Sequence, residues 1–191
     1  MEEYLYNRVK KCLMKMNMPE DTCAISFFVN ANEAHEYAGY SNLPEFVINY
    51  AAEEDFENAD EEEKWNCPLW VADHEEWILE YDETNECADH FLRWLLGMGI
   101  LNIGEEDTEN CYDADGNYIE KGPAGCYELT MLAGKIAGRL HEEGFLKEQI
   151  GREVPIIICD YEISWYVVEA TKMSNEISLI EDYLEFADEM Y

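Results

Sequence analysis

Cysteine and histidine side chains are the first candidates for chemistry in this chain. Cys87 and His90 are three residues apart in a segment with helical periodicity, and Cys67 and His74 precede them. Four such side chains could hold zinc. Structural zinc sites, however, usually pair their ligands as C-x2-4-C or H-x3-5-H, and these four residues form no such pair. We therefore predict core thiols and surface histidines, with no metal or other cofactor.

One aspartate is a candidate for acid–base chemistry. Asp160 follows the apolar stretch 154–159, and many α/β proteins place a functional carboxylate at the end of such a strand. Helix capping is the more common use of an aspartate there. The four histidines lie in no recognisable catalytic signature, and neither G-x-x-x-x-G-K nor G-x-G-x-x-G occurs. The sequence therefore predicts no catalytic residues with any specificity.

A short turn resembles part of a calcium loop. The segment 113–117 reads DADGN, and Gly116 would occupy the sixth position of such a loop. The first and twelfth positions would then be Cys111 and Gly122, where acidic ligands are required. Because both positions lack a carboxylate, we predict a hairpin turn flanked by Cys111-Tyr112 and Tyr118-Ile119.

An acidic segment stands out in the first half of the chain. Residues 53–63 read EEDFENADEEE, and Lys64 is the only Lys or Arg between Met16 and Leu92. Asn58 or Asp60 could cap a helix that runs to about Trp70, which would place carboxylates in its favourable first turn. Trp65, Leu69 and Trp70 would then face the core. The carboxylates predicted to bind a partner are Glu53, Glu54, Asp55, Glu57, Asp60, Glu61, Glu62 and Glu63.

The net charge restricts the possible partners. The 191 residues include 44 Asp and Glu against 12 Lys and Arg, which gives a formal net charge of -32. Small soluble domains usually need a charge of magnitude about 2 to 8. This excess would repel nucleic acids and anionic membranes, so it argues against both and favours a basic partner. A general acidic bias that maintains solubility is the alternative explanation.

Cysteine use and hydropathy predict the environment of the protein. Seven cysteines are scattered without the spacing of a disulfide framework, and most lie in apolar or aromatic contexts. The N-terminal residues MEEYLYNRVKK contain no apolar signal segment. No apolar run approaches the ~20 residues that a membrane span requires. These features predict a reduced, soluble, cytoplasmic protein.

The segment 124–145, AGCYELTMLAGKIAGRLHEEGF, predicts a central amphipathic helix. Its apolar residues recur at three- and four-residue steps, which places them on one face. Pro123 suits the start of such a helix and Gly144 suits its end. Four small residues would let another backbone come close, so we expect the helix to lie against a sheet. These small residues are Ala133, Gly134, Ala137 and Gly138.

The remaining periodicities predict one α+β domain over residues 1–191, with a small sheet of about three to five strands and helices on one of its faces. The first two strands are expected to pair antiparallel. The segment 163–172 is compatible with either a helix or a strand, and we favour a helix. Other helices are predicted over 2–16, 58–70, 84–98 and 177–190, and strands over 23–31, 46–50, around 77–79 and over 154–159.

Four segments carry a resemblance to a known group of proteins. The segments SFFVNANEA (26–34), EEKWNCPLW (62–70), VPIIICD (154–160) and ATKMSN (170–175), in this order, resemble a family of uncharacterised bacterial α+β domains of unknown function. The resemblance covers most of the chain. Small acidic bacterial proteins of this kind look like the immunity proteins found beside toxins, which implies inhibition by binding. The family offers no established catalytic residues.

The preferred hypothesis is therefore a non-enzymatic acidic protein that binds or neutralises a basic protein, such as a nuclease toxin. Aromatic side chains left exposed beside the acidic segment would anchor such a partner. The first alternative is an enzyme with an unrecognised pocket built from Asp160 and one of the histidines. The second is a structural or oligomeric module, and the extreme charge also allows a mimic of nucleic acid.

Overall fold

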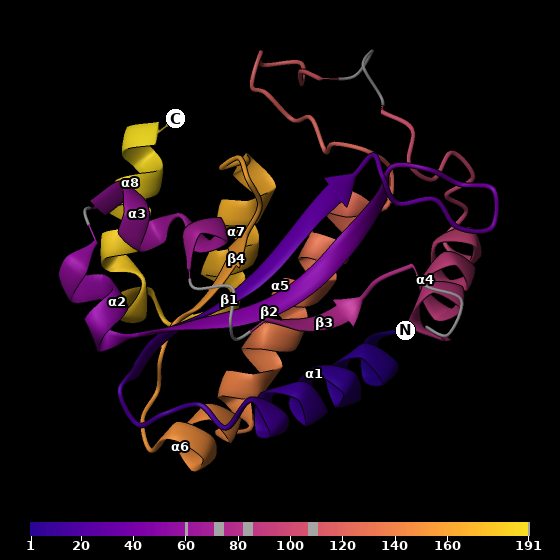
Figure 1. Ribbon diagram of the computed structural model, residues 1–191. Coiled ribbons are helices and arrows are strands. Elements are labelled where there is room, and N and C mark those ends of the chain that lie inside the picture. The colour runs from indigo at the N-terminus through magenta and orange to yellow at the C-terminus, as the bar shows by residue number, and fades with distance from the viewer. Residues whose placement is uncertain (60, 71–74, 82–85, 107–110, 191) are drawn as a thin grey trace.

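A four-stranded mixed sheet forms the centre of the fold (Figure 1). The computed structural model describes residues 1–59, 61–70, 75–81, 86–106 and 111–190. The strand order is β3-β2-β1-β4; β1 pairs antiparallel with β2, as predicted, and parallel with β4. The sheet and its helices confirm the α+β class. The strands are β1 (Thr22–Asn32), β2 (Leu43–Ala52), β3 (Glu76–Leu79) and β4 (Ile156–Cys159).

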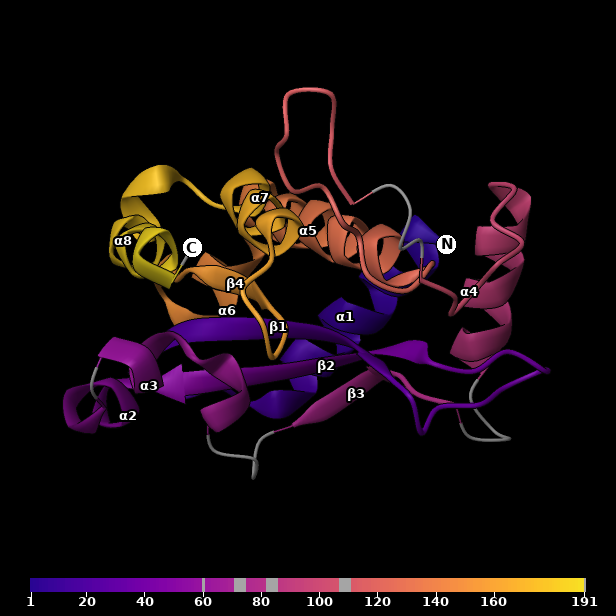
Figure 2. The same ribbon diagram turned by 90° about the horizontal axis from the view of Figure 1, so that it is seen from above.

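The main core lies between one face of the sheet and the helices α1 (Glu2–Met16) and α5 (Cys126–Glu142). Alternate residues of β1, such as Ile25 and Phe27, are fully buried on this face, as the period-two alternation of a strand requires. In Figure 2, α5 lies above the strands. Helix residues that contribute to this core include Leu5, Val9, Leu13, Leu129, Leu132, Ala133, Ile136 and Ala137.

A second apolar cluster covers the opposite face of the sheet. Ala24 of β1 belongs to it, together with Trp65 from α3 (Glu61–Trp65) and Tyr183 from α8 (Glu181–Met190). The expectation that helices cover only one face is therefore wrong. The physical reason is that β1 is apolar on both faces, so each face requires a covering layer. The burial of Trp65 in this layer confirms its predicted inward orientation.

Small residues of α5 bring a second helix, α7 (Trp165–Ser174), into close contact. A Cβ atom added at Gly134 would lie 2.9 Å from the backbone oxygen of Ala170, and one at Gly138 would lie 3.5 Å from that of Met173. These two glycines therefore face α7 and not the sheet, which corrects the expectation for this pair. Ala133, in contrast, is fully buried in the main core, so α5 contacts both neighbours.

Two of the predicted helices are interrupted. The helix predicted over 124–145 ends at Glu142, because Gly144 has a positive φ of 67° and begins a separate helix, α6 (Phe145–Ile150). The helix predicted over 177–190 consists of a 3-10 turn, η3 (Ile177–Leu179), followed by α8. The helical interpretation of 163–172 is confirmed by α7, and the helix predicted over 84–98 is present as α4 (Glu86–Gly97).

The helix predicted from residue 58 or 60 to residue 70 is wrong in its extent. The structure instead has α2 (Glu53–Asn58), α3 and a 3-10 turn, η1 (Cys67–Leu69). Ala59 is extended, with ψ of 145°, and Pro68 lacks the N–H group that a continuing helix would need. Trp70 is buried, as predicted.

The DADGN segment forms a turn stabilised by its own side chains. The carboxylate of Asp113 accepts hydrogen bonds from the backbone N–H groups of Asp115 and Asn117, each at 2.9 Å. An antiparallel bridge joins Tyr112 to Tyr118, which confirms the predicted hairpin. Hydrogen bonding to Asn117 lowers the pKa of Asp113, so this carboxylate is occupied within the turn.

The seven cysteines are free thiols, and Cys67, Cys87, Cys126 and Cys159 are buried. Within the described residues, no helix combines the length and apolar character needed to cross a bilayer.

Candidate functional site

Half of the predicted partner-binding carboxylates face solvent. Glu53, Glu54, Glu57 and Glu63 are exposed along α2 and α3. Asp55 is half-buried, and its carboxylate accepts a hydrogen bond of 2.7 Å from the backbone N–H of Ala52, so it stabilises the start of α2. Asp60 lies outside the described residues, as do the side chains of Glu61 and Glu62.

The C-terminal helix extends this acidic segment, a relationship that the sequence did not predict. Helix α8 packs against α3, although the two helices are far apart in the chain. Five acidic residues of α8 are exposed. We define the acidic surface as the exposed carboxylates of α2, α3 and α8, namely Glu53, Glu54, Glu57, Glu63, Glu181, Asp182, Glu185, Asp188 and Glu189.

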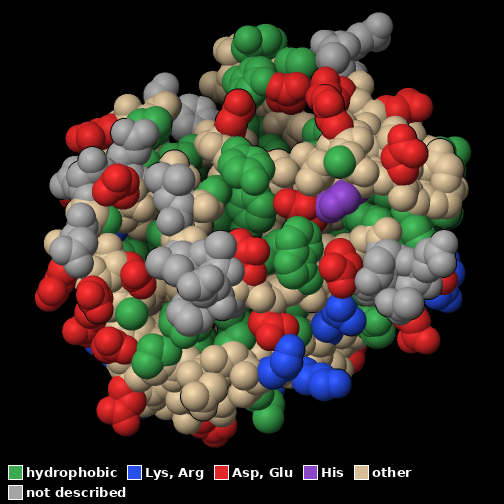
Figure 3. All heavy atoms as spheres, viewed as in Figure 1, with side chains coloured by type: hydrophobic (Ala, Val, Ile, Leu, Met, Phe, Trp, Pro, Cys, Tyr) green, Lys and Arg blue, Asp and Glu red, His purple; other side chains and the backbone are tan. Residues whose placement is uncertain are grey.

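Basic residues gather on a different part of the molecule. Four lie on α1, namely Arg8, Lys10, Lys11 and Lys15, and α5 and α6 add Lys135, Arg139 and Lys147. Figure 3 shows acidic side chains over α2 and α3 and a group of basic side chains over α1. Several of these cations are paired: Lys15 lies 2.7 Å from Glu76, and Arg139 lies 2.7 Å from Glu3. Most of the positive charges therefore lie away from the acidic surface, and Lys64 and Arg152, which pair with Asp182 and Glu53, are exceptions.

A pocket of about 320 Å³ opens between α3, α8 and the segment that follows β4. Its lining includes Trp65, Tyr183 and Phe186, and we call it the aromatic pocket. The rings of Trp65 and Tyr183 meet edge to face, with centroids 5.8 Å apart. Asp160 and Glu162 add carboxylates to the same lining. Aromatic rings with adjacent carboxylates suit an ammonium or guanidinium group.

The chain's own Lys64 shows how this surface holds a cation. Its ammonium nitrogen lies 4.8 Å from the centroid of the Trp65 ring and 5.3 Å from that of Phe56. The same nitrogen lies 3.2 Å from the carboxylate of Asp182. Cation–π and exposed ion-pair contacts each contribute about 0.5–1 kcal/mol, so several together can hold a basic side chain.

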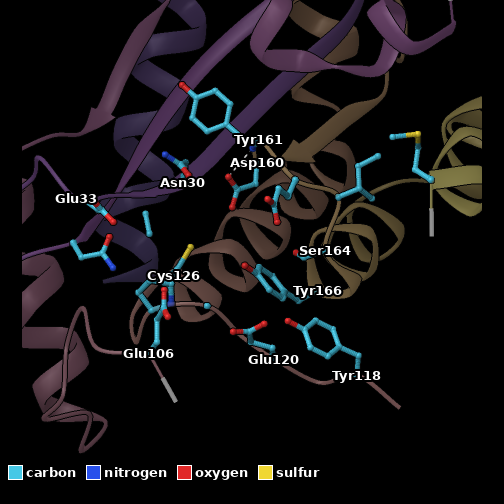
Figure 4. A pocket seen from close by; sticks show the side chains of 17 residues that line it. Asn30, Glu33, Glu106, Tyr118, Glu120, Cys126, Asp160, Tyr161, Ser164 and Tyr166 are labelled. Atoms are coloured by element: carbon cyan, nitrogen blue, oxygen red, sulfur yellow. Dashed lines mark hydrogen bonds between the residues drawn. The ribbon is translucent and has the colours of Figure 1, made fainter. Parts of the chain in front are cut away.

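A larger pocket lies on the other side of Asp160. It has a volume of about 560 Å³, and we call it the Asp160 pocket (Figure 4). Figure 4 shows the carboxylates of Glu106, Glu120 and Asp160 and the hydroxyl of Tyr166 arranged around one hollow. The lining comes from the end of β1, the loop before α5, the start of α5 and the segment between β4 and α7. These segments meet only in the folded chain.

Asp160 itself does not cap a helix. Ser164 is the N-cap residue of α7. The Asp160 carboxylate instead accepts a 2.6 Å hydrogen bond from the backbone N–H of Tyr161. Burial raises the pKa of Asp160 to about 7, and the negative charges of Glu162 and Glu45 add to this increase. The predicted capping role is therefore wrong, and this carboxyl group changes its charge near neutral pH.

Two neighbouring groups in the Asp160 pocket are held in their protonated forms. Burial raises the pKa of the Cys126 thiol to about 12, and Asp160 contributes to this increase. Burial also raises the pKa of Tyr166 above its ordinary value, with Cys126 and Asp160 adding to the effect. A thiol in this environment is a poor nucleophile, because the reactive form is the thiolate. The pocket therefore favours binding or proton transfer over thiol chemistry.

The histidines do not join Asp160 within the described part of the chain. His35 lies 3.5 Å from the buried carboxylate of Glu45, and the ring of His90 stacks on Tyr4 at 4.3 Å. His141 lies 3.0 Å from Glu153. His74 falls outside the described residues. Asp160 lines the pocket, and none of the three described histidines does.

The cysteine and histidine candidates for zinc are separated. Cys87 is buried in the main core, whereas Cys67 is buried in the second apolar cluster. Across the described residues, no three His, Cys, Asp or Glu side chains gather closely enough to hold a metal ion.

A comparison of the chain with protein-family models, curated proteins and solved structures finds no match. The functional interpretation therefore depends on the two pockets and the acidic surface. The sequence indicates an acidic, amphipathic helix over residues 177–190, which forms part of the acidic surface. It does not indicate that this segment lies beside α3.

Proposed function

We propose that this protein is a non-enzymatic binding protein whose acidic surface engages a basic protein partner. The observation that carries the proposal is that the aromatic pocket opens between α3 and α8, the helices that bear much of the acidic surface. The exposed carboxylates would steer a basic partner towards the surface. The aromatic pocket would receive one basic side chain and provide a desolvated anchor.

Neutralisation of a nuclease toxin is a specific form of this function. A nuclease binds a polyanion, so its own binding surface carries positive charge. A surface of carboxylates arranged around an aromatic pocket is complementary to such a site and would cover it. The resemblance to immunity proteins supports the same interpretation. Most basic residues lie on α1, α5 and α6, although Lys64 pairs with Asp182 and Arg152 pairs with Glu53 at the acidic surface.

A pull-down with charge-reversed variants tests the proposal. The surface variant carries Glu57→Lys, Glu63→Lys and Glu185→Lys, all at exposed positions. Basic proteins that the unmodified chain captures from a bacterial lysate at low salt should be lost with this variant. Capture should also fall steeply between about 50 mM and 500 mM NaCl, because added salt screens the attraction.

A matched control separates this surface from net charge. The control variant carries Glu2→Lys, Glu142→Lys and Glu148→Lys, which are exposed on α1, α5 and α6 and change the net charge by the same amount. It should capture the same proteins as the unmodified chain. Equal loss of capture in both variants, or capture that is indifferent to salt, would contradict the proposal.

The properties of Asp160 favour a second candidate, an enzyme that uses this carboxyl group as a general acid or base. A pKa of about 7 suits proton transfer at neutral pH, and the carboxyl group lines a pocket large enough for a small substrate. In that case Asp160→Asn would abolish turnover, whereas the surface variant with Glu57→Lys, Glu63→Lys and Glu185→Lys would retain it.

A further inference from the structure

The lining of the Asp160 pocket is strongly negative. Five carboxylates contribute to it, from the end of β1, the loop before α5 and the segment between β4 and α7. None of the described residues that line the pocket is basic. This pocket therefore concentrates negative potential in a partly enclosed volume, where charge interactions are stronger than on the open surface. The five residues are Glu33, Glu106, Glu120, Asp160 and Glu162.

A buried hydroxyl group in the same lining lacks a hydrogen-bond partner. The Oγ atom of Ser164 is inaccessible to solvent, and no group in the described structure forms a hydrogen bond of good geometry with it. It lies near enough to the Tyr166 hydroxyl to affect its pKa. A buried polar atom without a partner is unfavourable, so a ligand that supplies a donor here would stabilise the site.

The other polar and aromatic groups of the lining also accept positive charge. Asn30 and Asn42 provide side-chain carbonyl groups, and the exposed rings of Tyr118 and Tyr161 provide π faces. Every one of these contacts suits an N–H donor that carries positive charge. The pocket volume of about 560 Å³ lies within the ordinary range for small-molecule sites.

The placement of the carboxylates favours an organic cation over a metal ion as the ligand of this pocket. A metal ion requires several ligand atoms at bonding distance from one point. In the described residues no such group of three side chains exists, and the carboxylates of the pocket come from different walls. Carboxylates spread around a cavity suit a longer molecule with positive charges at more than one position.

We propose that the Asp160 pocket binds a small organic cation that carries two or more amino groups. Its ammonium groups contact the carboxylates on opposite walls, one N–H group donates to Ser164 Oγ, and its methylene groups lie against the tyrosine rings. This pocket shares Asp160 and Glu162 with the aromatic pocket, whereas Glu120 lines the Asp160 pocket and not the aromatic pocket. Glu120→Gln therefore tests this proposal without altering the surface proposed to bind a protein.

Isothermal titration of the full chain with spermidine, a triamine, tests this proposal at pH 8. We expect one saturable site per chain. The pocket variants are Asp160→Asn and, separately, Glu120→Gln, and both replacements preserve side-chain size. Glu120 lies in a loop outside the helices and strands, so loss of its charge should leave the fold intact. Each should weaken binding about ten-fold or more, because it removes a charged contact from a partly buried site.

Two controls keep the result specific to the pocket. Glu181→Gln and Glu185→Gln each remove one charge from exposed positions of α8 and should change spermidine affinity by less than about two-fold. A monoamine, titrated at the same ionic strength, should bind more weakly than spermidine. Equal weakening by pocket and control variants, binding without a defined stoichiometry, or full displacement of spermidine by Mg²⁺ at matched ionic strength would overturn the proposal.

Discussion

The hydroxyl group of Thr171 forms hydrogen bonds with both backbone groups of Ile158. It donates to the Ile158 carbonyl oxygen at 3.1 Å and accepts from the Ile158 N–H at 3.0 Å. Asn175 does the same for Ile156, at 2.8 and 2.9 Å. Because β4 is an edge strand, these side chains of α7 and of the residue that follows it replace the hydrogen bonds that a further strand would form. The helix therefore closes the sheet edge.

Removal of the Thr171 hydroxyl should destabilise the fold. Thr171→Val keeps the shape of the side chain but leaves a buried N–H and a buried carbonyl of Ile158 without partners. Each unsatisfied group costs about 1–3 kcal/mol, so we expect the free energy of unfolding to fall by about 2 kcal/mol or more. Urea unfolding monitored by circular dichroism measures this change.

Thr171→Ser is the matched control for the hydroxyl group. It retains the oxygen and loses one methyl group, so it should cost about 1 kcal/mol, less than Thr171→Val. If the valine variant proves as stable as the original chain, the side chain does not satisfy the edge of β4.

Gly134 and Gly138 allow a paired test of the contact between α5 and α7. A Cβ atom at Gly134 would lie 2.9 Å from the Ala170 carbonyl oxygen, which belongs to the backbone and cannot move alone. Alanine is favoured over glycine in a helix by about 1 kcal/mol, but overpacking costs about 1–3 kcal/mol. We expect the clash to exceed the propensity gain, so Gly134→Ala should lower the free energy of unfolding.

Gly138→Ala should have the opposite or no effect. Its added Cβ atom would lie at ordinary contact distance, 3.5 Å or more from its neighbours, so the helix propensity gain of up to about 1 kcal/mol is retained. Thermal unfolding of both variants gives the comparison. Equal effects at the two positions would mean that α7 does not approach α5 closely at Gly134.

Periodicity predicted the elements that bury a continuous apolar face. Helix α1 spans Glu2–Met16, as its stripe of apolar residues indicated, and β1 and β4 match their apolar runs. The breaks in the acidic region were not predicted, because eight acidic residues in residues 53–63 leave little apolar pattern to follow. Pro68 adds a further break, since it cannot donate the backbone hydrogen bond of a continuous helix.

The candidate sites depend on contacts that no local pattern encodes. Lys64 and Asp182 are 118 residues apart in the chain but form an ion pair of 3.2 Å. Asp160 was predicted as a candidate, but its capping role was wrong because α7 begins at Trp165, after Ser164, and not directly after the strand. Segments that are distant in the sequence build the pocket around Asp160, so its volume and charge became evident only from the structure.

Asp160 should make the stability of the chain depend on pH. Its folded-state pKa of about 7 lies above the ordinary value of 3.8, so the folded chain binds the proton more tightly between these values. The charged form is disfavoured in the fold, and stability is therefore lost as pH rises through this window. Relative to Asp160→Asn, the original chain should lose about 1–2 kcal/mol between about pH 5 and pH 8, since solvent access reduces the full effect.

Carboxyl carbon chemical shifts give a direct measurement of this pKa. The Asp160 signal should titrate with a midpoint near 7, and Glu162→Gln should lower that midpoint because it removes a neighbouring negative charge. The groups that influence the titration also include Glu45, Cys126 and Tyr166. A midpoint close to 4 in the original chain would contradict the buried, negative environment of Asp160.

The net charge of -32 should make stability depend on salt. Mutual repulsion among the carboxylates is stronger in the compact fold than in the expanded unfolded chain, and salt weakens it. We expect the free energy of unfolding to increase by about 1 kcal/mol or more between about 20 mM and 500 mM NaCl. The variant with Glu57→Lys, Glu63→Lys and Glu185→Lys should show a smaller increase, because the cluster that it neutralises contributes to the repulsion. Equal stability at both salt concentrations would mean that the carboxylates are spaced widely enough to avoid mutual repulsion, and the acidic surface would then lack the strong potential that steering of a basic partner requires.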